Sequence, residues 1–271
     1  MSKRILQAVV VTLAISLSSG LAAGRETIAI IGTGDLGESL GKRLASLDYT
    51  IVYGSRTPES DRVKALVAAT GEQASATTQQ KAAQLGDIIF LPIPWPAMET
   101  VAQSLGDLDG KIVVDVSDPW TQGDDGYPET RVKPSSAEMI QQWNPRAKVV
   151  KGLGTMGSMI IDNPEAVDGP VTIPVASDHR EAKERIARIV DEMGLDPVDF
   201  GPLRMAGLIE ALQIIYMIPL LQRRSEEWEF FFRRNADWVC RWQDDWTNPV
   251  YDAGDLAVMP ERHNPLTPCL Q

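Results

Sequence analysis

The feature that most constrains this chain is a glycine-rich turn set between an apolar segment and a helical one. The turn consists of Gly32, Thr33, Gly34, Asp35, Leu36 and Gly37. Residues 27–31, which precede it, read Thr-Ile-Ala-Ile-Ile and predict a buried parallel strand. Leucines recur after it at helical spacing, at positions 36, 40, 44 and 47, so a helix is expected to begin inside the turn.

A strand, a glycine turn and a helix start in this order form a binding site for a dinucleotide. The first glycine allows the tight turn, the second lets the backbone approach a pyrophosphate, and the third brings the helix against the strand. The free N–H groups and the dipole of the helix start favour phosphate oxygens. We therefore predict a dinucleotide site at residues 32–37.

The end of the next predicted strand indicates which dinucleotide binds. Residues 50–53 form this strand, and a protein specific for NAD would end it with Asp or Glu, which binds the ribose 2′-hydroxyl. The chain instead continues with Gly54, Ser55 and Arg56. Hydroxyl and guanidinium donors suit a 2′-phosphate, although Arg56 could also be an ordinary exposed loop residue. We predict NADP rather than NAD.

A second glycine hexad lies at residues 152–157, after a strand-like segment at residues 147–150. The chain reaches Pro164 within about two turns, which leaves little room for a helix with a strong dipole. We interpret this hexad as a loop at the carboxyl edge of the sheet that borders the nicotinamide, rather than as a second dinucleotide site.

Strand-like and helix-like segments alternate along the chain and predict a doubly wound parallel α/β sheet of the Rossmann type. Further strands are expected at residues 87–94, 111–116, 171–176 and 196–200. Further helices are expected at residues 61–69, 79–84, 138–143, 182–193 and 203–221, with Asp178 and Glu181 as a capping box before the fourth. The predicted organisation is a signal peptide at 1–23, an NADP-binding domain at 24–157, and a smaller C-terminal α/β and helical, aromatic-rich part at 158–271.

The first residues have the three parts of a secretory signal peptide. Lys3 and Arg4 precede an apolar run from about residue 8 to 17, and small residues follow up to Ala23. The run is shorter than the ~20 residues that a membrane span needs. We expect export to the periplasm or the medium after cleavage; the alternative is a cytoplasmic protein whose translation starts downstream.

Charge and composition exclude several classes of partner. The formal net charge of −11 makes nucleic acid and anionic membrane surfaces improbable partners. With only two histidines and no Cys-x-x-Cys pair, no metal site is predicted. Cys240 and Cys269 could form a disulfide or stay unrelated thiols. The apolar segment 203–221 contains Glu210, Gln213 and Pro219, which favours a buried or dimer helix over a membrane span, and we expect a homodimer.

Four segments of the chain resemble the deazaflavin-dependent NADP oxidoreductase family. This family includes the NADPH-binding domain of the six-transmembrane epithelial antigen of prostate metalloreductases. The segments are residues 31–37, 54–58, 93–95 and 199–203, with support from residues 115–119 and Glu210. Where the family often has Lys-Ala-Phe-Asn-Thr, residues 151–155 read Lys-Gly-Leu-Gly-Thr, so the substrate side departs more than the cofactor side.

The resemblance implies a role for each matching position. Residues 33–36 would line the pyrophosphate, and Ser55 and Arg56 would bind the 2′-phosphate. The nicotinamide side would be bordered by Ile93, Pro94, Ser117 and Gly152. Ligands at the carboxyl ends of parallel strands agree with this arrangement.

The preferred hypothesis is an NADPH-dependent reductase that passes hydride to a small flat redox acceptor, a flavin or deazaflavin as co-substrate, with metal-chelate reduction through flavin as an extension. Such a transfer depends on stacking and exclusion of water more than on a protein acid. The alternatives are a reductase of imines or of 2-oxo or 3-hydroxy acids, and a non-catalytic NADP-binding sensor. No catalytic residue is assigned. Asp118 is a possible proton donor, but we interpret it as a solvated loop or capping carboxylate. Lys151 is the only lysine at a strand end that faces the expected site, where the rival reductase would need a lysine, a tyrosine or an acid.

Overall fold

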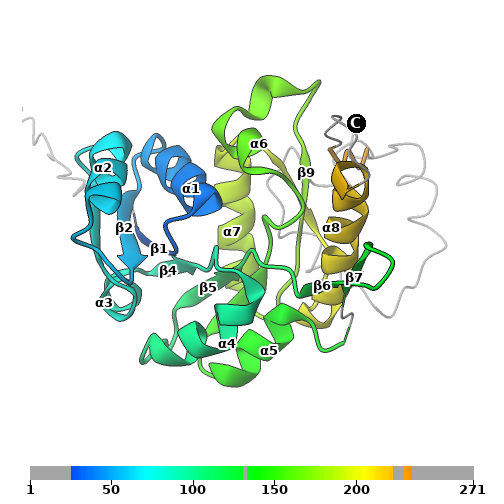
Figure 1. The fold of residues 1–271 in the computed structure, drawn as a ribbon, viewed down its shortest axis with the longest axis horizontal. Helices are drawn as coiled ribbons and strands as arrows, with labels where there is room; N and C mark the ends of the chain where they lie inside the picture. Colours follow the sequence, from blue (N-terminus) through cyan, green and yellow to red (C-terminus); the bar gives the residue numbers. More distant parts are fainter. Residues whose placement is uncertain (1–25, 131–132, 222–228, 234–271) are drawn as a thin grey trace, which may run out of the picture.

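The computed structural model describes residues 26–130, 133–221 and 229–233, and its centre is a parallel sheet (Figure 1). The strand order in this sheet is β3-β2-β1-β4-β5-β8. The strands are β1 (Thr27–Ile31), β2 (Thr50–Ser55), β3 (Ala74–Thr78), β4 (Ile88–Phe90), β5 (Ile112–Asp115) and β8 (Lys148–Lys151). Each strand pairs in parallel with its neighbours, which confirms the predicted doubly wound sheet.

Helices cover both faces of the sheet because successive side chains of each buried strand point to opposite faces. In β1, Ile28 and Ile30 pack on one side, and Ala29 and Ile31 pack on the other. The first side is covered by α1 (Asp35–Ala45), α2 (Asp61–Thr70), α6 (Ser158–Asp162) and α7 (Arg180–Glu192). The second side is covered by α3 (Gln79–Leu85), α4 (Trp95–Ser104) and α5 (Ser136–Trp143). The result is a three-layered α/β/α arrangement.

A small parallel sheet follows the large one in the chain. Its strands are β9 (Thr172–Val175) and β10 (Asp196–Asp199), and an antiparallel bridge joins Lys151 of β8 to Ala176 just after β9. Buried Ile173 and Ile186 belong to the same hydrophobic cluster as Ile30 of the large sheet. The two sheets therefore share a core, and the domain division at residue 157 stays a prediction.

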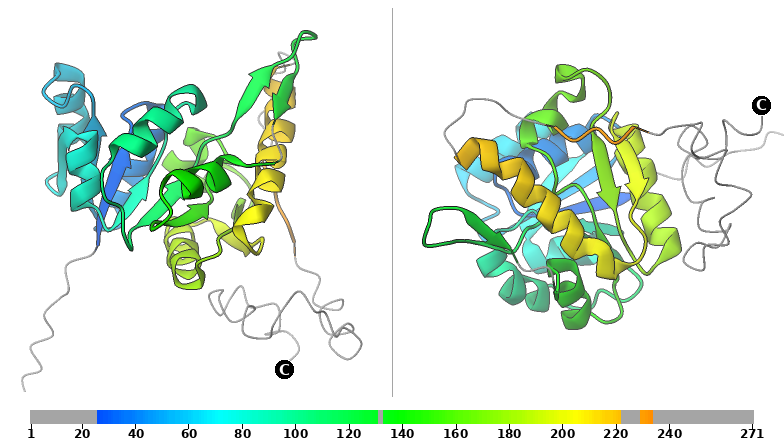
Figure 2. Two further views of the ribbon diagram at one scale, coloured as in Figure 1. Left: turned by 90° about the horizontal axis from the view of Figure 1, so that it is seen from below. Right: turned by 90° about the vertical axis from the view of Figure 1, so that its right-hand side faces the viewer.

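An antiparallel hairpin projects beside the last described helix (Figure 2). The hairpin is β6 (Trp120–Gln122) and β7 (Pro128–Thr130), and α8 (Ala206–Leu221) packs next to β7 and α5. Short 3-10 turns at Pro164–Ala166 and Leu203–Met205 complete the elements. Among the helices of the described ranges, none is both long enough and apolar enough to cross a bilayer.

The structure corrects two sequence-based expectations about the elements, and strand β3 is among the elements that it adds. The strand expected to reach Pro94 ends at Phe90, because Pro92 and Pro94 have no N–H for the ladder. Strand β3 escaped prediction because its Ala-Ser-Ala-Thr-Thr sequence lacks an apolar alternation. The Asp178 carboxylate does not cap α7 but accepts the Leu203 N–H at 3.0 Å.

Part of the aromatic tail packs on the small sheet. The Thr172 N–H donates to the Phe230 carbonyl at 2.9 Å, and Phe231 contacts the main hydrophobic cluster. This contact agrees with a core role for that residue. The predicted signal peptide at 1–23, both cysteines and the tryptophans from position 228 onward lie outside the described residues.

Candidate functional site

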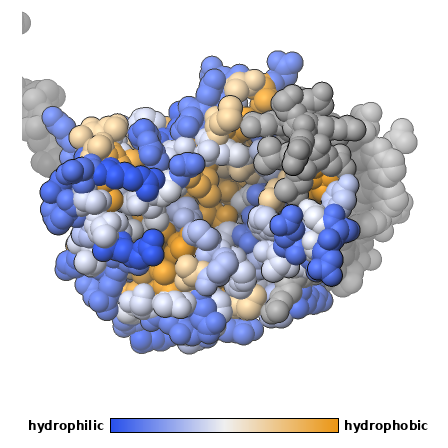
Figure 3. All heavy atoms as spheres, viewed as in Figure 1, coloured by the Kyte–Doolittle hydropathy of each residue, from blue (hydrophilic) through white to orange (hydrophobic). Residues whose placement is uncertain are grey.

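A hollow of about 420 Å³ lies at the carboxyl ends of β1, β2 and β4. It brings together the glycine turn, the end of β2 and the segment after β4. Among its lining residues are seven of the predicted cofactor-binding residues: Gly32, Thr33, Gly34, Ser55, Arg56, Ile93 and Pro94. These residues come from three separate parts of the sequence, so their meeting agrees with the prediction of one site. Apolar residues gather toward the middle of the molecular face shown in Figure 3, with polar residues around them.

The three glycines of the turn differ in what an added Cβ atom would meet. Gly32 has a φ of +133°, and a Cβ there would lie 2.6 Å from the Pro92 carbonyl oxygen. A Cβ on Gly37 would overlap the Gly32 carbonyl group. A Cβ on Gly34, by contrast, would meet no atom within 4 Å. Space is therefore left at the position where the second glycine is expected to let a pyrophosphate approach.

Helix α1 begins at this turn without a side-chain cap. Gly34 is its N-cap residue and provides no side chain for the first-turn N–H groups of Asp35, Leu36 and Gly37. Such N–H groups at the start of an 11-residue helix attract an anion, and the helix dipole adds to the effect. The geometry fits a bound pyrophosphate, and the role of these three residues stays a prediction.

Two arginines line the hollow near the end of β2. Arg56 is exposed in the turn after β2, where Ser55 Oγ accepts the Thr57 N–H at 3.1 Å. Arg62, in the first turn of α2, donates from Nη2 to the Thr33 carbonyl oxygen at 2.9 Å. The donor set and the absence of a carboxylate at the end of β2 fit the 2′-phosphate of NADP.

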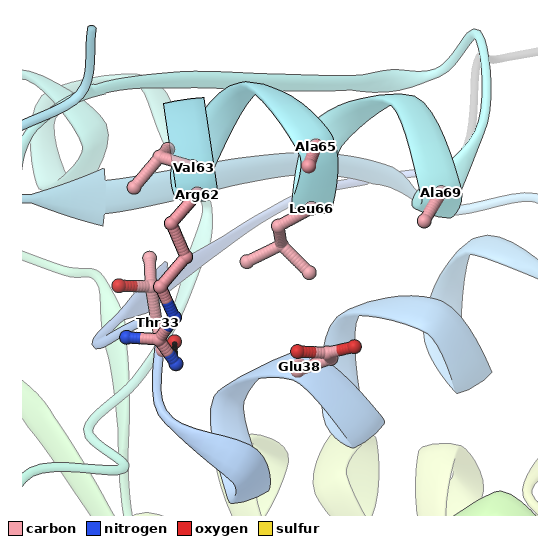
Figure 4. Close-up of a pocket in the computed structure, with 7 residues that line it drawn as sticks. All are labelled: Thr33, Glu38, Arg62, Val63, Ala65, Leu66 and Ala69. Atoms are coloured by element: carbon pink, nitrogen blue, oxygen red, sulfur yellow. Dashed lines mark hydrogen bonds between the residues drawn. The ribbon is translucent and has the colours of Figure 1, made fainter. Parts of the chain in front are cut away.

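Arg62 was missed by the sequence-based reasoning, although its place in the first turn of the helix after Arg56 could have indicated it. Figure 4 shows its side chain reaching from α2 toward Thr33 at the start of α1. It also borders a second hollow of about 290 Å³ between the two helices, together with Glu38 and Leu66. Arg62 therefore borders both hollows, as do Thr33 and Val63.

A buried charged cluster lies at the other end of the same sheet edge. Asp115 ends β5 and Lys151 ends β8, and the two residues are paired in register. Both side chains are fully buried, and Lys151 Nζ lies 3.1 Å from Asp115 Oδ2. Ser136 of α5 and Glu210 of α8 complete the cluster, with Lys151 Nζ 3.0 Å from Ser136 Oγ and 3.5 Å from Glu210 Oε1.

The hydrogen bonds around Asp115 stabilise it as an anion. Asp115 Oδ1 accepts the Ser117 N–H at 2.9 Å and the Ser117 hydroxyl at 2.7 Å. Its Oδ2 contacts Lys151 Nζ and Ser136 Oγ. Burial by itself lowers the pKa of Lys151, but the carboxyl groups of Asp115, Asp118 and Glu210 outweigh it and raise the pKa, so the ammonium stays charged.

Asp118 is buried, which corrects its interpretation as a solvated or capping carboxylate. Its side chain is 10% exposed, and Oδ1 has no hydrogen-bond partner among the described residues. Lys151 Nζ lies 3.9 Å away. Burial raises the pKa of Asp118 to about 8, with smaller contributions from Lys151, which lowers it, and from Asp115 and Glu210, which raise it.

Glu210 is fully buried on α8 and contacts Ser136 twice. Its Oε1 accepts the Ser136 N–H at 2.7 Å and lies 2.5 Å from Ser136 Oγ. Burial raises the pKa of Glu210, although Lys151 and the hydrogen bonds from Ser136 act in the opposite direction.

The structure places the remaining predicted residues beside this cluster and not at the hollow. Ser117 and Gly152 do not appear among the residues that line the hollow within the described chain. Ser117 bonds to Asp115, and a Cβ on Gly152 would lie 3.1 Å from Val175 Cγ1. Their role at the nicotinamide stays a prediction. Lys151 is enclosed, so the expectation that it faces the site is wrong.

The second glycine hexad forms a loop, as predicted, because the helix after it has only five residues. Leu153 in this loop has a φ of +62° although it is not glycine. The carboxylates nearby do not form a metal site, since no group of metal-ligating side chains occurs in the described part of the chain.

Comparisons with known proteins agree with this geometry. Residues 27–119 match the family described as "NADP oxidoreductase coenzyme F420-dependent". The chain is 28% identical over 187 residues to Metalloreductase STEAP3 of Rattus norvegicus, an alignment that covers 69% of this chain and 36% of that protein. It is 26% identical over 205 residues to the F420-dependent NADP reductase of Methanothermobacter marburgensis, covering 68% of this chain and 88% of that protein.

The fold has solved counterparts. A putative F420-dependent NADP-reductase from Arthrobacter sp. FB24 superposes with a TM-score of 0.69 at 24% identity, covering 77% of this chain and 100% of that one. The chain spans only about a third of the length of the metalloreductases that it matches. Residues 27–119, which contain the glycine turn and the end of β2, therefore match the family of coenzyme F420-dependent NADP oxidoreductases.

Proposed function

We propose that this protein is an NADPH-dependent reductase that passes a hydride to a flat redox acceptor of the flavin or deazaflavin class. The observation that carries the proposal is the hollow at the glycine turn, with Ser55 and Arg56 at the end of β2 where NAD-specific proteins have a carboxylate. The matched family and the name of the methanogen relative support the same activity.

The residues of the hollow define how the cofactor would lie. The uncapped start of α1 would hold the pyrophosphate, and Ser55, Arg56 and Arg62 would surround the adenosine 2′-phosphate. The nicotinamide would then extend past Ile93 and Pro94 toward β5, on the other side of the glycine turn. NADPH supplies a hydride at that ring, and the chain supplies position and exclusion of water.

The acceptor class is supported by the relatives' names, which point to a deazaflavin in one case and to a metal in the other. Hydride transfer between two flat rings depends on close stacking of the rings. Reduction of a metal chelate through a flavin is an extension of the same chemistry.

A second candidate is reduction of an imine or a carbonyl compound. Asp118 favours this candidate. In such a reduction the hydride goes to carbon, and the nitrogen or oxygen needs a proton from another source, which a buried carboxyl with a raised pKa can supply. A third candidate, a non-catalytic sensor, would bind NADPH without oxidising it.

We also propose that the protein is an exported homodimer. The signal-peptide pattern of residues 1–23 supports export. Leu208 and Ile215 on α8 are 48% and 51% exposed, which supports burial of this helix against a second copy. Light scattering of the purified chain would give the mass of a dimer, and the mass of one chain would contradict it.

Oxidation of NADPH by the purified chain tests the proposed function. The acceptors should include flavin mononucleotide, a 5-deazaflavin, a ferric chelate, a cyclic imine and a 2-oxo acid, each with NADPH and NADH. We expect the fastest turnover with NADPH and a ring acceptor. Turnover only with the imine or the oxo acid would establish the second candidate, and tight NADPH binding without any oxidation would establish the sensor.

A further inference from the structure

The cluster at the ends of β5 and β8 contains three carboxyl groups and only one ammonium. We propose that Asp118 is the proton donor of the reduction, an uncharged carboxyl that transfers its proton to the acceptor as the acceptor receives the hydride. The inference rests on the proposed function and adds to it the residue that supplies the proton.

Charge balance is the first step of the argument. Asp115, Lys151 and Glu210 are fully buried, and Asp118 is nine-tenths buried. A buried anion without a paired cation is strongly unfavourable. One ammonium balances one carboxylate, so a cluster with all carboxyl groups ionised would hold two uncompensated negative charges. Asp115 is the anion, because serine and lysine donors surround both of its oxygens.

The Ser136 hydroxyl locates one of the bound protons. Its Oγ contacts Asp115 Oδ2 and lies 2.5 Å from Glu210 Oε1. A hydroxyl has a single proton, so it can donate to only one of these two oxygens, and the other contact needs a proton from the carboxyl group. Because Asp115 is the anion, Glu210 carries that proton. Burial raises the pKa of Glu210, which agrees with this assignment.

Asp118 is the second neutral carboxyl. The charged groups that face it are Lys151 from β8, Asp115 from its own β5 segment and Glu210 from α8. Lys151 is already engaged by Asp115 at 3.1 Å and lies 3.9 Å from Asp118 Oδ1. No hydrogen bond to that oxygen occurs among the described residues, so the distant Lys151 ammonium is the one positive group that stabilises a carboxylate there, and burial outweighs it. With the pKa of Asp118 raised to about 8, the group is mostly protonated at pH 7.

Position and exposure separate Asp118 from Glu210. Asp118 follows β5, which pairs with β4, and the segment after β4 lines the dinucleotide hollow through Ile93 and Pro94. A Cβ on Gly154 would lie 3.6 Å from Asp118 Oδ2, so the carboxyl borders the second glycine loop. Its 10% exposure allows proton exchange with solvent, whereas Glu210 is fully enclosed.

The proposed step balances in atoms and electrons. The acceptor gains a hydride, which carries two electrons, from NADPH and a proton from Asp118, so the acceptor is reduced and NADPH is oxidised to NADP⁺. The O–H bond of the Asp118 carboxyl breaks as an N–H or O–H bond forms on the acceptor. The carboxylate then takes a proton from solvent, which restores the cluster.

The first test compares the wild type with Asp118→Asn, a variant of nearly the same shape that has no acidic proton. We expect its kcat at pH 7 to fall roughly a hundredfold or more, the usual size of a general-acid contribution. The affinity for NADPH should not change. In the wild type kcat should decrease above a pKa near 8, and this decrease should be absent in the variant. Asp124→Asn, at an exposed position of the β6–β7 hairpin, is the matched control and should behave as wild type.

The second test needs no turnover. Infrared spectra of the full chain at pH 7 should contain a protonated-carboxyl band that is missing from Asp118→Asn, and in the difference spectrum this band should disappear with a pKa near 8. Its absence would show that Asp118 is ionised and would overturn the proposal.

The two kinds of failure differ. If the wild type reduces an acceptor and Asp118→Asn does so equally fast with the same pH profile, the donor role is wrong and the reductase remains. If none of the tested acceptors supports oxidation of NADPH by the wild type, the proposed function fails and the donor role fails with it.

Discussion

The charged side chains at the two ends of the same sheet edge differ in exposure and in pairing. At the β1–β2 end, Arg56 and Arg62 lie at the surface of the dinucleotide hollow, and neither has an ion pair with a carboxylate among the described residues. At the β5–β8 end, Lys151 is enclosed with carboxyl oxygens of Asp115, Glu210 and Asp118 within 4 Å. The first end leaves its cations available for an anionic ligand, whereas the second neutralises its charges internally.

This difference indicates a division of labour between binding and chemistry. Phosphate groups arrive with their own charge, so a binding site needs unpaired donors and an open backbone. A group that must hold a proton at neutral pH needs burial and neighbouring carboxylates, which raise its pKa. We expect substitutions at the first end to change cofactor affinity and substitutions at the second end to change stability and pH dependence.

Lys151→Met is expected to have the largest effect, because it removes the cation of the buried cluster. Breaking a buried ion pair from one side costs about 3–5 kcal/mol, since an uncompensated charge remains. The free energy of unfolding in urea at pH 7 measures this loss. Lys64→Met is the control, because Lys64 pairs with Glu59 at the exposed surface and should have little effect.

A double variant sharpens the same prediction. Lys151→Met combined with Asp115→Asn should recover part of the lost stability, because no carboxylate then needs the ammonium. Equal stability of Lys151→Met and the wild type would mean that the cluster is not charged as described.

Gly34→Val tests the β1–β2 end, which we call the binding end. The added side chain points into space that is empty in the structure, so the fold should persist while the pyrophosphate path is blocked. We expect NADPH affinity to fall at least a hundredfold, about 3 kcal/mol or more. Calorimetric titration measures it, and the thermal midpoint checks the fold.

Gly154→Val is the corresponding experiment at the β5–β8 end, which we call the chemistry end. Its side chain would approach the Asp118 carboxyl, whose oxygens lie 3.6 and 3.7 Å from a Cβ at this position. Turnover should fall while NADPH affinity stays within a few-fold of the wild type. Loss of NADPH binding in this variant, with Gly34→Val still binding, would reverse the assignment of the two glycine loops.

Arg56→Ala should have a smaller and selective effect. Removing a charge-assisted contact to the 2′-phosphate should weaken NADPH binding by about 1.5–3 kcal/mol and leave NADH binding unchanged. Arg146→Ala, on an exposed surface pair with Asp107, serves as the control. Equal affinity of the wild type for NADPH and NADH would contradict the assignment of the 2′-phosphate site.

The smallest effect, taken per pH unit, is a slope in the pH dependence of stability. The folded-state pKa of Asp118, about 8, lies above its unfolded value near 4, so the native state binds the proton more tightly. Stability from this group is therefore present at low pH and is lost as the pH rises from about 4 to about 8, at up to roughly 1.4 kcal/mol per pH unit.

Asp118→Asn should remove this slope. Urea unfolding of both proteins at pH 5, 6, 7 and 8 would show the variant gaining stability relative to the wild type as the pH rises. Parallel curves would show that the carboxyl is not held protonated in the folded state.

The binding end could be predicted from sequence because its signal is local. The strand, the glycine turn, the start of α1 and the Ser55–Arg56 pair lie within about 30 residues, and the spacing of the glycines follows a known motif. Arg62 was missed because an arginine in the first turn of a helix is ordinarily a surface residue.

The chemistry end could not be predicted in the same way, because its residues are brought together by the fold. Ser136, Lys151 and Glu210 are distant in sequence from Asp115 and meet it only when β5, β8, α5 and α8 pack. One signal was available: two apolar strands each end in a charge of opposite sign, which suggests a buried pair. Without their partners, Asp118 was interpreted as solvated and Lys151 as facing the site, and both interpretations were wrong.

Transfer of deuterium tests the central claim most directly. The purified chain would be mixed in a single turnover with NADPH that is deuterated on either face of C4 of the nicotinamide, together with the ring acceptor that it reduces. The account predicts that deuterium from one of the two faces is transferred to the acceptor ring. Transfer from NADPH labelled on that face should be slower than transfer from unlabelled NADPH. Bound NADPH that keeps its label, with no oxidation in the presence of any acceptor, would contradict the reductase and leave a nucleotide-binding protein.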